Sequence, residues 1–286
     1  MKNPTPLRIA LIGAGGKMGC RIVDHLMDNP GYVLCCVEPN EQALANLASR
    51  KVSSMASDLA VRDADVVILA VPDKVLGRVA QDLEPGFRPG TLVVTLDPAA
   101  AHAGELDLRS DLSVFVTHPC HPSVFEHEED PRARADFFGG TLAKMPIVCA
   151  LMQGPEEHYT LGERLARDFL APVSRAHRIT VAQMAMLEPA MAETVGIALI
   201  AALRESLEEV VRRGVPRAAA EDFLYGHIKV PLGIAFGRVN FPFSDGARLI
   251  AEYGRQRVLQ PDWKRVFEPD SVTEQVRVIV SGKLPT

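Results

Sequence analysis

Glycines near the start of the chain have the spacing of a phosphate-binding turn. The apolar run 7–12 predicts a buried strand, the stretch from Gly13 to Gly19 predicts a tight turn, and residues 20–27 predict a helix that leaves it. Glycine adopts unusual backbone angles and lets a phosphate approach bare N–H groups at a helix N-terminus. The third glycine comes one position later than in the usual fingerprint. We interpret the pattern as the variant Gly13-x-x-Gly16-x-x-Gly19 of a dinucleotide-binding turn.

A carboxylate at the end of the next expected strand indicates which dinucleotide binds. The run 32–37 predicts that strand, and Glu38 ends it about 20 residues after the glycines. An acidic residue there hydrogen-bonds the ribose hydroxyls of NAD and repels the additional phosphate of NADP. No arginine directly follows Glu38, so we expect NAD. The expected cofactor-binding residues are Gly13, Ala14, Gly15, Gly16, Lys17, Met18, Glu38, Val71 and Pro72.

Strands and helices alternate through the first part of the chain. This alternation predicts an α/β fold, a doubly wound parallel sheet of the Rossmann type, whose ligands bind beyond the carboxyl ends of the strands. Val71 and Pro72 should therefore lie along the cofactor, and His118 should point toward its nicotinamide end. Further strands are expected at 65–71, 91–96, 112–117, 147–152 and 172–178, and helices at 40–49, 74–83 and 155–170.

Two histidines follow one of these strands in a proline-braced loop. His118 and His121 could bind a metal or orient a substrate carboxylate, since imidazole does both. The alternative is ordinary turn chemistry, with the histidines exposed by accident. The position beside the expected cofactor favours function for His118 and leaves His121 open.

The composition changes at about residue 179. From there to Arg213 the chain consists mostly of helix formers and ends in Gly214, a typical cap. Such a long apolar helix should be buried against other helices or a second subunit, so we expect a homodimer. Two domains are expected, a NAD-binding domain at 1–178 and an all-helical domain at 179–286 built on this helix. Shorter helices are expected at 217–225, 232–236, 245–259 and 271–280, with a break at 226–231.

Polar residues in the helical half are candidates for catalysis. Glu188 and Glu193 stand among apolar residues, where a buried carboxylate is costly unless it is paired or metal-bound. The alternative is a solvated stripe, although Pro189 should bend or break the helix and could re-aim Glu188. His227 and Lys229, in the expected break, could reach a substrate carboxylate or simply be solvated.

Composition excludes some classes of function. The net charge of −5 argues against nucleic-acid binding, which requires a basic surface. The most apolar later stretch, 195–203, is too short to cross a membrane. The five cysteines are scattered and the N-terminus has no apparent signal peptide, which together favour a cytoplasmic protein with reduced thiols.

The order of these parts resembles the 6-phosphogluconate dehydrogenase-like superfamily. The stretches 9–19, 117–125, 188–196 and 226–233 resemble, more narrowly, its family with a phosphogluconate dehydrogenase C-terminal-like domain, which includes the D-apionate oxidoisomerases. The lysine–x–x–asparagine pair typical of β-hydroxyacid dehydrogenases is absent, because Glu193 to Gly196 occupy that region. The resemblance implies NAD-dependent oxidation of a branched sugar acid at C2, followed by a carbon shift to 3-oxo-isoapionate.

That chemistry would use a divalent cation as Lewis acid and template, such as zinc, manganese or magnesium. We expect His118 and Glu193 as metal or substrate ligands, Glu188 as base, and His227 or Lys229 as carboxylate binder. The alternatives are a simple or a decarboxylating sugar-acid dehydrogenase, or a non-catalytic NAD-sensing protein.

Overall fold

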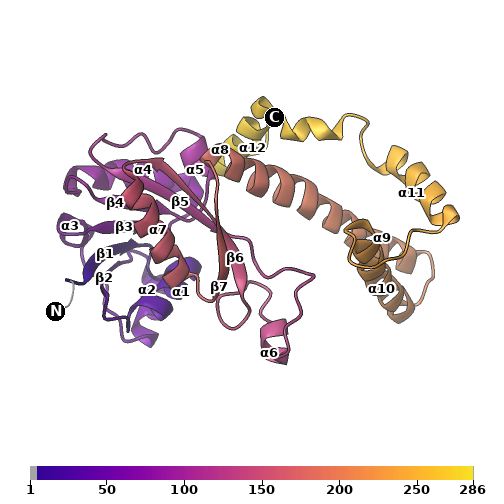
Figure 1. Ribbon diagram of the computed structural model, residues 1–286, viewed down its shortest axis with the longest axis horizontal. Helices are drawn as coiled ribbons and strands as arrows, with labels where there is room; N and C mark the ends of the chain where they lie inside the picture. The colour runs from indigo at the N-terminus through magenta and orange to yellow at the C-terminus, as the bar shows by residue number, and fades with distance from the viewer. Residues whose placement is uncertain (1–4, 286) are drawn as a thin grey trace. The chain divides into compact units, whose positions relative to one another are not determined.

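The computed structural model describes residues 5–285, which include a single seven-stranded sheet (Figure 1). The strand order is β2-β1-β3-β4-β5-β6-β7, and every neighbouring pair is parallel except β5 and β6. The expected α/β fold of the Rossmann type is confirmed. The strands are β1 (Leu7–Ile12), β2 (Tyr32–Val37), β3 (Val66–Leu69), β4 (Leu92–Thr95), β5 (Ser113–Pro119), β6 (Met145–Gln153) and β7 (Val173–Arg178).

Helices cover both faces of this sheet, because the central strands are apolar on both sides. Ile9 and Leu11 of β1 belong to the core on one face, whereas Ala10 and Ile12 belong to the core on the other. The first face is covered by α1 (Lys17–Leu26), α2 (Glu41–Ser49) and α7 (Glu156–Phe169). The second is covered by α3 (Ser57–Arg62), α4 (Asp73–Leu83), α5 (Ala99–His102) and α8 (Val181–Ala185).

The antiparallel pair β5–β6 departs from the expected parallel arrangement. A parallel neighbour needs a crossover connection, usually a long helix. The segment between β5 and β6 contains only the short helix α6 (Pro131–Arg134), so the chain turns back beside β5. The longer helix α7 then carries the chain across, and β7 is parallel to β6.

The chain divides into two compact units. The first contains Met1–Glu188 and Thr273–Thr286, and the second contains Pro189–Val272. The division differs from the expected ranges 1–178 and 179–286 because α8 and most of α12 (Pro269–Ser281) belong to the same compact unit as the sheet. The other helical elements are η2 (Met186–Ile197), α9 (Ala198–Arg212), α10 (Arg217–Ala235), α11 (Asp245–Val258) and η3 (Trp263–Phe267).

The long helix expected from residue 179 is present as α8, η2 and α9, which follow one another directly. Its middle part, η2, is a π-helix that contains Pro189. Proline has no N–H to donate and normally interrupts an α-helix, but the wider π turn accommodates it here. Pro189 therefore does not break the helix as expected.

The prediction of a break at 226–231 is also wrong, because α10 is continuous through these residues. Pro231 lies inside this helix, so it leaves the carbonyl of His227 without its usual donor but does not end the helix. His227 and Lys229 are therefore exposed side chains on a helix and not parts of a shaped loop.

Candidate functional site

Close packing explains the glycines of the turn between β1 and α1. A Cβ atom at Gly15 would lie 2.3 Å from the carbonyl oxygen of Ala43, and one at Gly19 would lie 2.1 Å from that of Gly13. Gly13 itself has a φ of +81°, in the region that favours glycine. A Cβ at Gly16 would meet its nearest neighbour only at 3.3 Å. The turn thus requires glycine at three positions for its own shape, and it exposes bare backbone at the start of α1.

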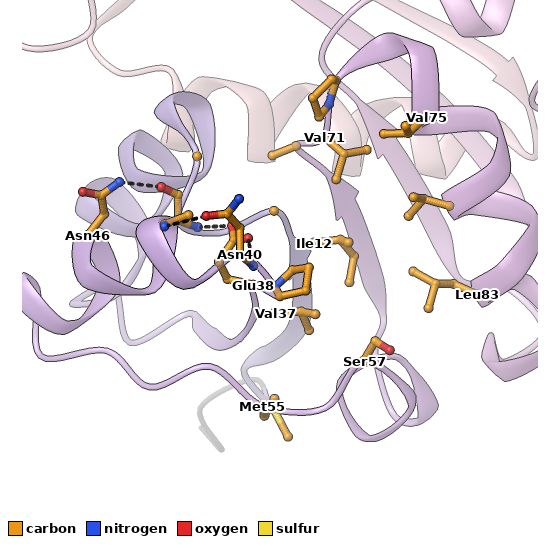
Figure 2. A pocket seen from close by; sticks show the side chains of 18 of the residues that line it. Ile12, Val37, Glu38, Asn40, Asn46, Met55, Ser57, Val71, Val75 and Leu83 are labelled. Atoms are coloured by element: carbon orange, nitrogen blue, oxygen red, sulfur yellow. Dashed lines mark hydrogen bonds between the residues drawn. The ribbon is translucent and has the colours of Figure 1, made fainter.

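A cavity of about 1000 Å³ lies along this turn (Figure 2). It is large enough for a dinucleotide, since small-molecule sites range from about 300 to 1000 Å³. Two of the expected cofactor residues do not line it: Ala14 is buried, and Met18 lines a neighbouring cavity. The other expected cofactor residues all line it, namely Gly13, Gly15, Gly16, Lys17, Glu38, Val71 and Pro72.

Glu38 is held at the edge of this cavity by hydrogen bonds. Its carboxylate accepts one from the Gly15 N–H at 3.0 Å and one from the Asn40 N–H at 2.9 Å. Asn46 steadies the same turn, since its side-chain amide donates to the Gly15 carbonyl at 2.9 Å (Figure 2). The carboxylate is therefore placed beside the glycine turn, where a ribose hydroxyl would meet it.

A second cavity of about 470 Å³ continues from the first. The two share Gly16, Lys17 and the pair Val71–Pro72 as lining residues. The second cavity adds Asp97, which comes shortly after β4, and His118, which lies at the carboxyl end of β5. Polar groups at the carboxyl ends of strands thus surround the continuation of the dinucleotide cavity, as expected for a site of this fold.

Two of these groups, Asp97 and His118, form with Glu188 of η2 a cluster that has the chemistry of a metal site. One ligand atom from each of Asp97, His118 and Glu188 lies within 4.8 Å of the others. His118 Nε2 is 3.9 Å from a carboxylate oxygen of Asp97 and also 3.9 Å from one of Glu188. All three side chains are largely shielded from solvent, and all three belong to the first unit.

His118 has the protonation state that would let its Nε2 donate a lone pair to a cation held by this cluster. Its Nδ1–H donates to the Pro119 carbonyl at 2.9 Å, which leaves Nε2 unprotonated in the neutral ring. Burial lowers the pKa of His118 to about 4, with a smaller contribution from His121, so the ring is neutral near pH 7. A neutral imidazole whose other nitrogen is bonded to a backbone carbonyl is the usual form of a metal-bound histidine. The donor set suits a divalent cation.

The structure brings the expected site residues together in a different combination from the one predicted. His118 lies with Glu188, and Asp97 joins them in place of Glu193. Asp97 was missed, although its position directly after a buried strand was a usable signal. Glu193 is half-buried in η2 of the second unit, to which His227 and Lys229 also belong. Their expected roles stay predictions.

His121 lines the second cavity beside His118. Its ring centre lies 6.4 Å from that of His118, and its Nδ1–H donates to the Phe138 carbonyl at 2.9 Å. His121 also has a φ of +60°, uncommon for a residue other than glycine. Its position is thus fixed by the loop that contains Phe138.

Comparisons with known proteins agree with this arrangement. Residues 126–280 match the family model "Phosphogluconate dehydrogenase (decarboxylating) C-term", and residues 8–98 match "NADP oxidoreductase coenzyme F420-dependent". The chain is 45% identical to a D-apionate oxidoisomerase of Cupriavidus necator, over 95% of this chain and 99% of that protein. It is 46% identical to a D-apionate oxidoisomerase of Rhizobium rhizogenes, over 95% and 98%.

A solved structure is also similar to the whole chain. A semialdehyde dehydrogenase NAD-binding protein from Cupriavidus necator, in complex with calcium and NAD, has a TM-score of 0.93 at 44% identity, covering 96% of this chain and 100% of that one.

Proposed function

Because the chain belongs to the D-apionate oxidoisomerase family, we propose that it is an NAD-dependent oxidoisomerase of a branched sugar acid, D-apionate. It oxidises the C2 hydroxyl and then shifts carbon to give 3-oxo-isoapionate. The observation that carries the proposal is the Asp97–His118–Glu188 cluster beside the continuation of the dinucleotide cavity.

The glycine turn and Glu38 fit NAD. The turn presents bare backbone at the N-terminus of α1, where a pyrophosphate binds. Glu38 would bind the adenosine ribose, and its negative charge disfavours the additional phosphate of NADP. Val71 and Pro72 lie where the two cavities meet, so they would contact the cofactor toward its nicotinamide end.

The cluster fits a divalent cation, with Asp97, His118 and Glu188 as ligands in place of the expected pair His118 and Glu193. When bound, the cation would polarise the C2 and C3 oxygens of the substrate, and NAD would accept the hydride from C2. A carboxylate has two oxygens, so Glu188 can hold the cation with one and accept the C2 hydroxyl proton with the other. His118 keeps its Nε2 lone pair available because its Nδ1–H is bonded to the Pro119 carbonyl.

The test is turnover with D-apionate and NAD, followed by NADH absorbance with and without a chelator. We expect NADH to form, chelation to stop it and manganese or calcium to restore it, and NMR to show 3-oxo-isoapionate. An unrearranged ketone would indicate a simple dehydrogenase, and release of carbon dioxide would indicate a decarboxylating one. NADH binding without turnover on any sugar acid would indicate a NAD-sensing protein.

We also propose that the protein is a homodimer in the cytoplasm. Many large apolar side chains of the second unit are exposed, such as Ile200 at 66% and Phe223 at 67%, and exposed apolar groups of this kind usually mark an interface. Among the described residues one helix, Val181–Arg212, is also long and apolar enough to cross a membrane, with 11% of its most apolar window buried. We prefer a second copy of the chain to a membrane as the surrounding of these apolar side chains, because the carboxylates Glu188 and Glu193 lie on that helix. Light scattering should give twice the chain mass, and Ile200→Asp should give a monomer.

A further inference from the structure

Arg21 is a cation that lines the second cavity and forms no ion pair with the described residues. It lies on α1, one turn after Lys17, and lines the same cavity as Asp97 and His118. No carboxylate oxygen lies within ion-pair distance of its guanidinium in the described part of the chain. Its Nε is buried and has no hydrogen-bond partner.

The groups that surround Arg21 do not satisfy it. Its contact with the Met145 sulfur, at 3.8 Å, is a weak hydrogen bond. Asp136 is the carboxylate whose charge acts on Arg21, but its Oδ2 already accepts from the N–H groups of Thr141, Leu142 and Ala143. Burial lowers the pKa of Arg21, which agrees with a partly desolvated charge. A buried donor without an acceptor costs free energy, so this guanidinium favours an anion.

The guanidinium is fixed in place by the loop that follows α6. A Cβ atom on Gly140 would overlap the Arg21 guanidinium, which therefore packs directly against this loop. Lys17, the other cation of the cavity, is engaged differently, because its Nζ lies 3.8 Å above the centre of the Phe138 ring. Arg21 is thus a cation that lines this cavity and has at least one donor, Nε, without a hydrogen-bond partner in the described part of the chain.

We propose that Arg21 binds the carboxylate of the substrate and makes the site specific for sugar acids. The inference rests on the proposed function, since it assumes that the second cavity holds the substrate. A guanidinium binds a carboxylate through parallel hydrogen bonds, which orients as well as attracts it. The hydroxyl end of the same molecule is then left to Asp97, His118 and Glu188. This assignment replaces His227 and Lys229 as the carboxylate binder.

The test compares D-apionate with its uncharged amide in wild type, Arg21→Met and Arg21→Lys. Arg21→Met should raise KM for D-apionate roughly 10- to 100-fold, the loss expected for hydrogen bonds to a charged group, with a smaller change in kcat. It should bind the amide as wild type does, and Arg21→Lys should recover part of the affinity for D-apionate. The control is Arg132→Met, which removes an arginine of α6 that pairs with Asp130 and does not line the cavity.

Two results would overturn the assignment. One is an unchanged preference of Arg21→Met for the acid over the amide. The other is an equal loss of both ligands and of NADH binding, which would mean that Arg21 only supports the loop. If wild type does not oxidise D-apionate at all, the proposed function fails separately.

A second measurement then decides whether Arg21 binds a carboxylate. It monitors D-glycerate binding to the NADH-loaded protein by NADH fluorescence, and only a loss of binding in Arg21→Met supports the assignment.

Discussion

His118 Nε2 lies 3.9 Å from a carboxylate oxygen of Glu188, although β5 carries the histidine and the long helix carries the glutamate. The π-helical segment η2 begins just before Glu188, and a π turn changes the direction in which side chains leave a helix. Segments of this kind are often found at functional sites. The contact of Glu188 with His118 therefore depends on this local irregularity as well as on the sheet.

Glu188→Gln should weaken divalent cation binding and stop turnover. The substitution keeps the size of the side chain but removes a charge from the three-residue donor set. We expect the affinity for manganese or calcium, measured by calorimetry, to fall roughly 10- to 100-fold or more. Glu157→Gln, an exposed position of α7, is the matched control. Unchanged cation affinity in Glu188→Gln would remove this residue from the metal site.

Gly15→Ala and Gly16→Ala should differ in stability. The added Cβ overlaps the Ala43 carbonyl at position 15, whereas at position 16 it meets the Gly13 carbonyl at 3.3 Å. We expect Gly15→Ala to lower the free energy of unfolding by about 1–3 kcal/mol, the usual cost of forced overlap. Gly16→Ala should lower it by less than Gly15→Ala does, by about 1 kcal/mol or below, because the Gly13 carbonyl has to move by only a few tenths of an ångström. Equal destabilisation of the two variants in urea titrations would contradict the packing described for the turn.

Glu38→Ala should relax the preference for NAD over NADP. It removes both the acceptor for the ribose and the charge that repels the additional phosphate. KM for NAD should rise roughly tenfold or more, as expected for a lost charged hydrogen bond of about 1.5–3 kcal/mol. KM for NADP should fall in the same variant. Glu41→Ala, on the exposed side of α2, controls for a general loss of charge. A wild-type ratio of the two KM values in Glu38→Ala would show that Glu38 does not select the cofactor.

The buried thiols should resist alkylation until high pH. Burial raises the pKa of Cys149 to about 11 and that of Cys36 to about 12. The thiolate is the reactive form and Cys149 is fully buried, so its labelling near pH 8 should be much slower in the native than in the unfolded protein and should rise with pH. Iodoacetamide labelling followed by mass spectrometry measures this, with urea-unfolded protein as the control. Equal labelling of Cys149 in native and unfolded protein at pH 8 would disprove the shift.

Glu193→Gln tests the expectation that the second unit contributes to catalysis. Glu193 is predicted from the sequence to be a metal or substrate ligand, because it stands in an apolar stretch. The variant should therefore lose turnover while it binds NADH with wild-type affinity, measured by fluorescence. Full activity in Glu193→Gln would leave the chemistry to the first unit.

The sequence determined the nucleotide half of this protein. The glycine turn, the position of Glu38 and the apolar strands depend on neighbours along the chain, and local patterns report such neighbours well. The family was also predicted, because its resembling stretches are short and distinctive. Local patterns failed to predict that the helices α10 and η2 continue through a proline. Contacts around a helix can keep a proline inside it although the helix propensity of proline is very low.

Tertiary structure alone decided that Asp97, His118 and Glu188 lie together and that Arg21 forms no ion pair with the described residues. Asp97 comes after β4, His118 lies in β5 and Glu188 lies in η2, and no spacing in the sequence relates them. The sequence predicted His118 and Glu193 as ligands, and both glutamates stand on one expected helix. Only the three-dimensional structure shows that Glu188 lies beside the histidine. Whether a charge is paired depends on distances through space, which the order of residues does not contain.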